Sequence, residues 1–227
     1  MAIGVCASHK IADRATLCTL IKAWAVIARA NPSSSCVDIP EFVGASTFLP
    51  EPIPHVSPNW SNIVESSKAF VGNQHATKFF SFDASTIASL KANVVSDDAV
   101  SKPTRVEVVS AVIKGISELS SKYVDKSRHD EAILAIIQDN LELGLAFVGG
   151  EIELYINSWC GYKFYDVDFG WDKPLWVSPI DLPVKNFILL MDSRDSGGID
   201  VWVYLKEKDM KVFEQELIDQ LAIGSAK

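Results

Sequence analysis

The sequence predicts a protein of the mixed α/β class, in which helices and strands follow one another in irregular order. Three observations predict it. The apolar run at residues 2–9 is followed by helical periodicity over residues 14–30. The aromatic run at residues 77–82 leads into a second helical stretch. Residues 186–217 have the pattern of a strand, a glycine-containing turn, a second strand and a helix.

The first element is predicted to be a buried strand that ends near His9, because the run "AIGVCASH" is apolar on both of its alternating faces. Asp13 then has the position and the side chain of a helix cap. The helix that it begins should extend to about Ala30, before the sequence "NPSSS". Its buried stripe is predicted from apolar residues at helical spacing, which are Leu17, Leu20, Ile21, Trp24 and Ile27.

The middle of the chain is predicted to contain an irregular crossing and further helices. Residues 32–62 are rich in Pro, Ser and Asn but also apolar, so we expect them to lie over a surface or line a cleft. The strand at residues 77–82 should be followed by a helix that Asp83 or Ser85 caps. Another helical run is expected near residues 130–143, and the aromatic run at residues 153–179 is predicted to be strand-like.

The stretch "PTRVEVVSAVIKGISELSSKYVDK" predicts a long helix beginning after Pro103. Thr104 and Glu107 have the spacing of a capping box, in which each side chain accepts a hydrogen bond from the other residue's backbone. Its buried stripe is predicted to consist of Val106, Val109, Ile113, Ile116 and Leu119.

Composition and charge exclude several classes of function. Hydrophobic residues make up 48% of the 227 residues and the net charge is −8, so there is no basic surface for nucleic acid. No secretory signal or membrane-length apolar run is visible, which favours a cytoplasmic location. The spacing of the Cys and His residues does not match a zinc site, and we expect no metal. The four cysteines lie far apart, at Cys6, Cys18, Cys36 and Cys160.

The sequence "SHKIAD" places His9 four residues before Asp13, directly after the predicted strand. A neutral imidazole there can accept a proton near neutral pH, and such general-base assistance contributes roughly 10²- to 10⁴-fold in rate. The plainer interpretation is a buried structural histidine and a helix-capping aspartate. Other catalytic patterns, namely GxSxG, GxGxxG and the Walker loop, do not occur, and Cys6 should face away from His9.

Several motifs in one order point to a family. "HKIAD" comes first, "TRVEVVSA" and "NSWC" follow, and "DFGW" with "KPLWVS" comes last. Taken together, and over nearly the whole chain, these resemble the plant BAHD acyltransferases. The resemblance implies transfer of an acyl group from acyl-CoA, with acetyl-CoA expected, to a hydroxyl of a plant specialised metabolite. It also implies a small-molecule alcohol acceptor, a cytoplasmic protein that is a monomer, and no nucleic-acid or membrane partner.

The resemblance assigns roles to residues of this chain. His9 and Asp13 would form the catalytic motif, with His9 as general base and Asp13 fixing the loop. Asn157 and Trp159 would be candidates for stabilising the oxyanion. The DFGW segment would organise the fold away from the chemistry, through Asp168, Phe169, Gly170 and Trp171.

The implied fold is a chloramphenicol-acetyltransferase-like, two-domain α/β architecture that is incomplete. We expect the end of the first domain at residues 1–60, with the HxxxD motif and crossover loop, and most of the second at residues 61–227. Family chains are roughly twice as long. We therefore expect truncation at the N-terminus and an internal deletion near Ile113-Lys114, where two family segments are joined directly in one helix.

Three residues depart from the family pattern. Arg14 and Asp172 stand where glycine is usual, and Gly161 stands where many relatives have a basic residue. If Asp172 has a positive φ angle, it tolerates that angle less well than glycine. These departures and the length leave two other functions open. In the first, the chain is a catalytically inactive remnant or gene-model fragment of such an enzyme. In the second, it is a module that binds a full-length relative.

Overall fold

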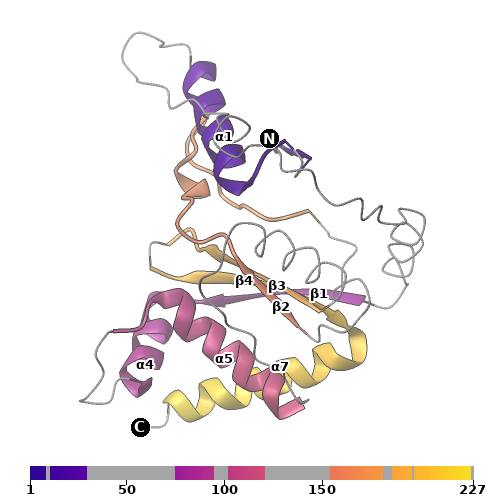
Figure 1. The fold of residues 1–227 in the computed structure, drawn as a ribbon. Helices are drawn as coiled ribbons and strands as arrows, with labels where there is room; N and C mark the ends of the chain where they lie inside the picture. Colours follow the sequence, from indigo (N-terminus) through magenta and orange to yellow (C-terminus); the bar gives the residue numbers. More distant parts are fainter. Residues whose placement is uncertain are drawn as a thin grey trace, which may run out of the picture. The chain divides into compact units, whose positions relative to one another are not determined.

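The computed structural model describes residues 1–8, 11–29, 75–94, 102–120, 154–180, 186–195 and 197–225 (Figure 1). The predicted crossing at residues 32–62 and the predicted helix at residues 130–143 lie outside these ranges. The described elements in chain order are α1 (Arg14–Ala28), β1 (His75–Phe82), α4 (Ala84–Val94), α5 (Arg105–Ser120), β2 (Tyr155–Ser158), the 3-10 turn η1 (Phe164–Asp166), β3 (Phe187–Asp192), β4 (Ile199–Lys206) and α7 (Glu207–Ser225).

The chain divides into two compact units. Unit 1 consists of Met1–Ser57 with Gly161–Ser178, and unit 2 consists of Pro58–Cys160 with Pro179–Lys227. The segment Gly161–Ser178 therefore belongs with the N-terminal residues, although it is distant from them in sequence. The predicted domain boundary at residue 60 stays a prediction.

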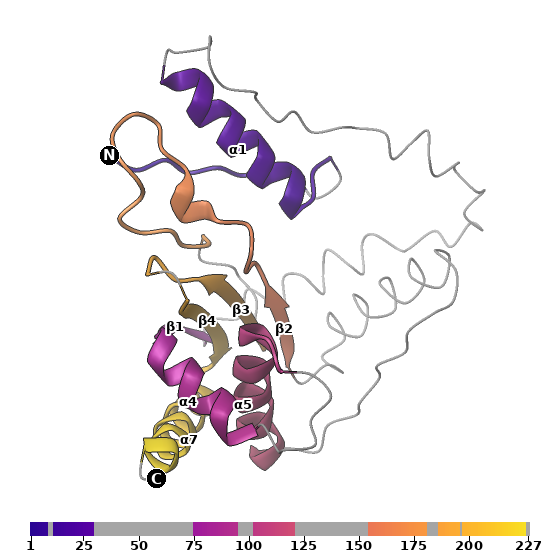
Figure 2. The same cartoon turned by 90° about the vertical axis from the view of Figure 1, so that its left-hand side faces the viewer.

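Unit 2 has a four-stranded sheet with helices on one face. The strand order is β1-β4-β3-β2, in which β4 is antiparallel to both neighbours and β2 is parallel to β3. Helices α4, α5 and α7 cover one face of this sheet, as Figure 2 shows. Alternate residues of β4 point into the core between the layers, and Val201 and Val203 there are at most 1% exposed.

The C-terminal half of unit 2 confirms the predicted order of strand, turn, strand and helix. Strands β3 and β4 form a hairpin, which is closed where the Ser193 amide donates to the carbonyl of Gly198. Gly198 is required by packing, because a Cβ atom there would lie 2.8 Å from the carbonyl oxygen of Phe82. Helix α7 then begins at Glu207, directly after β4.

Helix α5 confirms the predicted capping box and, at Val109, Ile113 and Ile116, the predicted buried stripe, whereas Val106 is partly buried. The Thr104 amide donates to Glu107 Oε2 at 2.6 Å, and the Glu107 amide donates to Thr104 Oγ1 at 3.2 Å. The helix continues without interruption through Ile113-Lys114. Val109 and Ile113 are fully buried, so the buried face of the helix persists up to the expected junction. The side chain of Leu119 lies outside the described ones.

Two other helix caps fit their predictions. Asp13 caps α1, with its Oδ1 accepting from the Thr16 amide at 2.7 Å. Asp83, and not Ser85, caps α4, with its Oδ1 accepting from the Thr86 amide at 2.7 Å. The hydrogen bond from the Thr86 amide lowers the pKa of Asp83.

The predicted buried strand at residues 2–9 is wrong. Residues 1–8 form no strand and are largely exposed, and Ile3 is 40% exposed. Alternating apolar residues predict burial only where a neighbouring strand can pair with the backbone, and no described strand pairs with residues 1–8.

The predicted stripe of α1 is also largely wrong. Cys18 and Ala25 are the buried residues, whereas Leu20, Trp24 and Ile27 are 47% to 64% exposed. Small side chains on the Cys18 face allow the backbone of the segment after Gly161 to approach the helix.

The aromatic run at residues 153–179 forms much less strand than its composition predicts. Only Tyr155–Ser158 is strand. Positive φ angles then turn the backbone repeatedly, at Gly161, Lys163, Gly170 and Asp172. A strand cannot continue through such residues, because extended backbone requires a negative φ.

Of the helices that the structure describes, none is long and apolar enough to span a bilayer.

Candidate active site

The residues on either side of His9 and Lys10 are joined by hydrogen bonds just before helix α1. The carbonyl of Ser8 accepts hydrogen bonds from the amides of Ile11 at 3.0 Å and Ala12 at 3.2 Å. His9 lies between these residues in sequence but outside the described residues, so its role stays a prediction. Asp13 begins α1, because its side chain accepts from the Thr16 amide and its carbonyl accepts from the Leu17 amide. This contact gives Asp13 the structural task of a helix cap, and its part in the catalytic motif stays a prediction.

Arg14 follows the cap and lies against an aromatic ring. Its guanidinium carbon is 5.3 Å from the ring centroid of Tyr162, within the range of a cation–π contact. One helical turn further, the thiol of Cys18 donates to the carbonyl of Tyr162 at 3.0 Å. Two departures from the family pattern, Arg14 and Gly161, therefore occur at one contact, since Gly161 directly precedes Tyr162.

The DFGW loop is organised by the carboxylate of Asp168. Its Oδ1 accepts from the amides of Gly170 at 2.7 Å and Asp172 at 3.1 Å, and its Oδ2 lies 3.6 Å from Arg29 Nη1. Gly170 has a φ of +98°, and a Cβ atom there would lie 3.3 Å from Arg29 Cγ. Glycine at this position therefore permits both the turn and the close approach to the end of α1.

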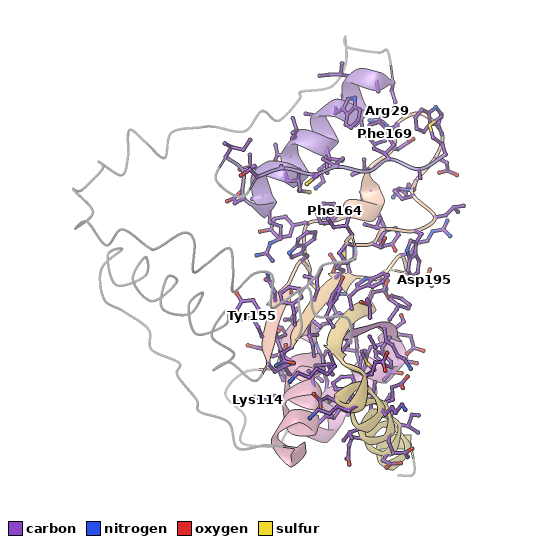
Figure 3. The ribbon with its side chains drawn as sticks, turned by 90° about the vertical axis from the view of Figure 1, so that its right-hand side faces the viewer. Arg29, Lys114, Tyr155, Phe164, Phe169 and Asp195 are labelled. Atoms are coloured by element: carbon purple, nitrogen blue, oxygen red, sulfur yellow. The ribbon has the colours of Figure 1, made fainter. Side chains whose placement is uncertain are left out.

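Aromatic rings join the same loop to the same helix. The ring of Trp24 meets the ring of Phe169 edge to face, with centroids 5.1 Å apart, and Phe169 stacks on Trp171 at 5.9 Å. Figure 3 shows Phe169 beside Arg29 near the C-terminal end of α1. Trp171 is 60% exposed, so its contribution is the stacked ring rather than burial.

Asp172 confirms the expected departure in backbone geometry. Its φ is +82°, in the left-handed region that favours glycine. Its Oδ1 accepts from the amide of Lys173 at 2.8 Å, which compensates part of the backbone strain. Lys173 also pairs with Asp166 at 2.8 Å, and this hydrogen bond lowers the pKa of Asp166 and raises that of Lys173.

Asn157 and Trp159 lie in unit 2, on and just after strand β2. Asn157 is half-buried and pairs with Leu189 in the parallel register, and the Trp159 amide donates to the carbonyl of Leu190 at 2.6 Å. Burial raises the pKa of the next residue, the Cys160 thiol, which makes it a poor thiolate nucleophile. The assignment of Asn157 and Trp159 to the oxyanion stays a prediction.

Four polar residues in these contacts were not singled out by the sequence. Arg29 and Tyr162 appear only through the fold. Arg105 donates to Asp192 Oδ1 at 3.0 Å and to the carbonyl of Gly198, so it ties α5 to the β3–β4 turn. The sequence signal that could have identified Arg105 was its place in the family segment "TRVEVVSA".

Asp200 is the fourth polar residue that the sequence did not single out. It is 6% exposed and accepts from Ser81 Oγ at 2.8 Å, and burial raises the pKa of its carboxyl. A lone acidic residue between Ile199 and Val201, in an otherwise apolar strand, was its signal. Among the side chains that the structure describes, no three potential metal ligands come together.

The fold and the two motif segments define a protein of the chloramphenicol-acetyltransferase-like class, present in incomplete form. Vinorine synthase has a similar structure, with a TM-score of 0.66 and 22% sequence identity. The similarity covers 93% of this chain and 60% of the synthase.

The model of the Transferase family matches residues 1–114 and 110–219. The chain therefore belongs to this family, which includes the BAHD acyltransferases. Its similar relatives include the limonoid 1-O-acetyltransferase of Citrus sinensis and the stemmadenine O-acetyltransferase of Catharanthus roseus, each 29% identical. A BAHD acyltransferase of Arabidopsis thaliana is 27% identical.

The chain is shorter than these relatives. The three alignments cover 95% to 97% of this chain but only 62% to 65% of the relatives. The alignment with the Citrus protein extends over 289 positions, more than the 227 residues of this chain, so that relative has internal segments that are missing here. The two family matches meet at residues 110–114, which supports the internal junction expected at Ile113-Lys114.

Proposed function

We propose that this chain is an acyl-CoA-dependent O-acyltransferase that transfers an acetyl group to a hydroxyl of a plant specialised metabolite. The observation that carries the proposal is the attachment of both family motifs to one helix. Asp13 of the HxxxD motif caps the N-terminus of α1, and Asp168 of the DFGW motif pairs with Arg29 at its C-terminus. The acetyltransferase names of the relatives support the reaction class.

In the proposed reaction His9 accepts the proton of the acceptor hydroxyl. The oxygen then attacks the thioester carbonyl of acetyl-CoA directly, the carbon–sulfur bond breaks, and the coenzyme A thiolate leaves with the proton from His9. Asn157 and Trp159 would stabilise the negative charge on the carbonyl oxygen. No acyl-enzyme forms and no metal takes part. The proposed protein is monomeric and cytoplasmic, and its net charge of −8 suits small-molecule substrates better than nucleic acid.

The second candidate is a catalytically inactive remnant, which in one form binds a partner protein. The observation that favours it is the missing internal sequence, since the aligned relatives have segments that this chain lacks. Holding two substrates in the correct relative position can lower the activation barrier by roughly 7–11 kcal/mol. A chain that lacks part of its substrate-binding wall would lose much of that contribution.

The test combines binding and turnover. The purified chain is melted with and without acetyl-CoA, and then incubated with acetyl-CoA and either stemmadenine or a limonoid alcohol, while mass spectrometry follows the acetyl ester. The proposal expects a higher melting temperature with acetyl-CoA, by mass action on the folded state, and an ester that grows with time. A melt indifferent to acetyl-CoA and no ester with either acceptor would support the remnant.

A further inference from the structure

Arg105 joins the start of helix α5 to the ends of two neighbouring strands. It is the first residue of α5, and its Nη2 atom donates to Asp192 Oδ1 at 3.0 Å. Its Nη1 atom donates to the carbonyl of Gly198 at 3.1 Å. Asp192 is the last residue of β3, and Gly198 directly precedes β4. One planar guanidinium therefore holds both strand ends against the helix.

Strand β3 in turn carries the end of β2. The two strands are parallel, and just after β2 the Trp159 amide donates to the carbonyl of Leu190 at 2.6 Å. Leu190 lies two residues before Asp192, so the Arg105 ion pair and the end of β2 occur at the same edge of the sheet. Among the strands that the structure describes, β3 is the one neighbour of β2. The position of Trp159 therefore depends on where the end of β3 is held.

The ion pair also lies close to Cys160, just after β2. Burial raises the pKa of the Cys160 thiol, and the charges of Asp192 and Arg105 both act on it as well. Cys160 and Ile156 pack against the core between the sheet and the helices. Because side chains alternate along a strand, Asn157 points to the opposite face of the sheet. Arg105 belongs to the helix layer, so its effect on Asn157 passes through the strands.

We propose that Arg105 is a positioning residue, which fixes the end of strand β2 and thereby the oxyanion candidates Asn157 and Trp159. The inference rests on the proposed function for the part that these two residues play. Hydrogen-bond donors stabilise an oxyanion only where they are held at the place of the developing charge, so a shifted strand end would slow the reaction. Lysine would replace Arg105 poorly, because an ammonium lacks the planar fork that reaches both acceptors.

The kinetic test compares variants of this contact with a matched control. Arg105→Gln removes both hydrogen bonds of the guanidinium, Asp192→Ala removes one, and Arg105→Lys keeps the charge without the fork. The control is Lys78→Gln, because Lys78 forms an ion pair with Glu214 that likewise joins a strand of this sheet to a helix. A purely structural role would lower the melting temperature but leave the kcat of the folded enzyme unchanged.

We expect Arg105→Gln to lower kcat roughly three- to tenfold, the range that an ordinary hydrogen bond supplies, while the KM for acetyl-CoA changes little. Asp192→Ala should lower kcat less, since the contact with the carbonyl of Gly198 remains. The double variant should be no slower than Arg105→Gln alone. Arg105→Lys should recover only part of the loss, and Lys78→Gln should keep the wild-type kcat.

An unchanged kcat in Arg105→Gln, or full recovery by Arg105→Lys, would overturn the inference. If Arg105→Gln does not fold, Asp192→Ala provides the same comparison. If the wild type shows no turnover, the proposed function fails and amide exchange decides the positioning separately. The Trp159 amide should then exchange faster in Arg105→Gln than in the wild type, while the amides of β1 keep their rates. An unchanged Trp159 amide, or an equal rise across the whole sheet, would contradict the positioning role.

Discussion

The Oδ2 atom of Asp168 lies 3.6 Å from a guanidinium nitrogen of Arg29, which joins the DFGW loop to the residue that ends helix α1. The other carboxylate oxygen accepts two backbone amides of the loop. The same carboxylate therefore shapes the loop and attaches it to the helix. Because Asp13 begins that helix, the two family motifs belong to one structural unit.

The two tasks of Asp168 predict different losses of stability. Asp168→Asn keeps the Oδ1 acceptor and loses only a partly exposed ion pair, so unfolding in urea should show a cost of about 0–1 kcal/mol. Asp168→Ala also removes the acceptor of the exposed Gly170 and Asp172 amides, which should raise the cost to about 1–2 kcal/mol, since a hydrogen bond contributes roughly 0.5–1.5 kcal/mol. Asp166→Ala, in the exposed pair with Lys173, should leave the unfolding midpoint unchanged. Equal losses for the Asn and Ala variants would mean that Oδ1 does not organise the loop.

Asp172 offers a test of backbone strain in the same loop. With φ at +82°, Asp172→Gly should stabilise the protein by up to about 1 kcal/mol, since glycine adopts this angle without steric cost. Asp172→Ala should destabilise it, because alanine meets the same steric cost and lacks the oxygen that accepts from Lys173. Thermal melts of the three proteins give the order, and an alanine variant more stable than the glycine variant would refute the assignment.

The buried carboxyl of Asp200 predicts a dependence of stability on pH. Its pKa is higher in the folded protein than the value of about 3.9 expected for the unfolded chain, so the folded state binds the proton more tightly. That contribution is fully present below the unfolded pKa and is lost as the pH rises through the folded pKa. Above its folded pKa, the ionised Asp200 therefore lowers the free energy of unfolding.

Asp200→Asn should accordingly raise the urea midpoint at pH 7.5, because the amide oxygen can still accept from Ser81 without a buried charge. The gain should shrink as the pH approaches 4. Asp219→Asn, at an exposed carboxylate of helix α7, should show no such gain. A gain at Asp200 that is equal at both pH values would exclude ionisation as its cause.

Helix α5 predicts how well the two family segments are joined. Ile113 is fully buried and Lys114 is exposed, although both stand at the junction. Ile113→Ala should cost about 2–5 kcal/mol in urea unfolding, as in a packed core, and Lys114→Ala less than about 0.5 kcal/mol. A small cost at Ile113 would mean that the helix does not pack across the junction as the structure describes.

Local signals in the sequence predicted much of unit 2. The caps at Asp83 and Thr104 follow from side chains that bond backbone amides three residues away, and such contacts need no distant partner. The hairpin of β3 and β4 follows from two apolar runs around glycines. In each case the residues that decide the structure lie within one short stretch.

Unit 1 was predicted less well because its contacts join residues far apart in sequence. The exposed positions of Leu20 and Ile27 depend on which face of α1 meets the segment after Gly161, and periodicity alone does not specify that face. The same holds for the pairing of Arg29 with Asp168. A resemblance in sequence identified Asp168 and Gly170 as a motif, but only the fold shows the arginine that they approach.

The measurement that tests the account most directly is the rate of acetyl ester formation by the wild type, His9→Ala and His75→Ala. The account predicts that His9→Ala is slower by roughly 10²-fold or more, the contribution of a general base. His75→Ala, at the first residue of β1, should keep the wild-type rate. Turnover by His9→Ala at the wild-type rate would contradict the assignment of His9 as the base.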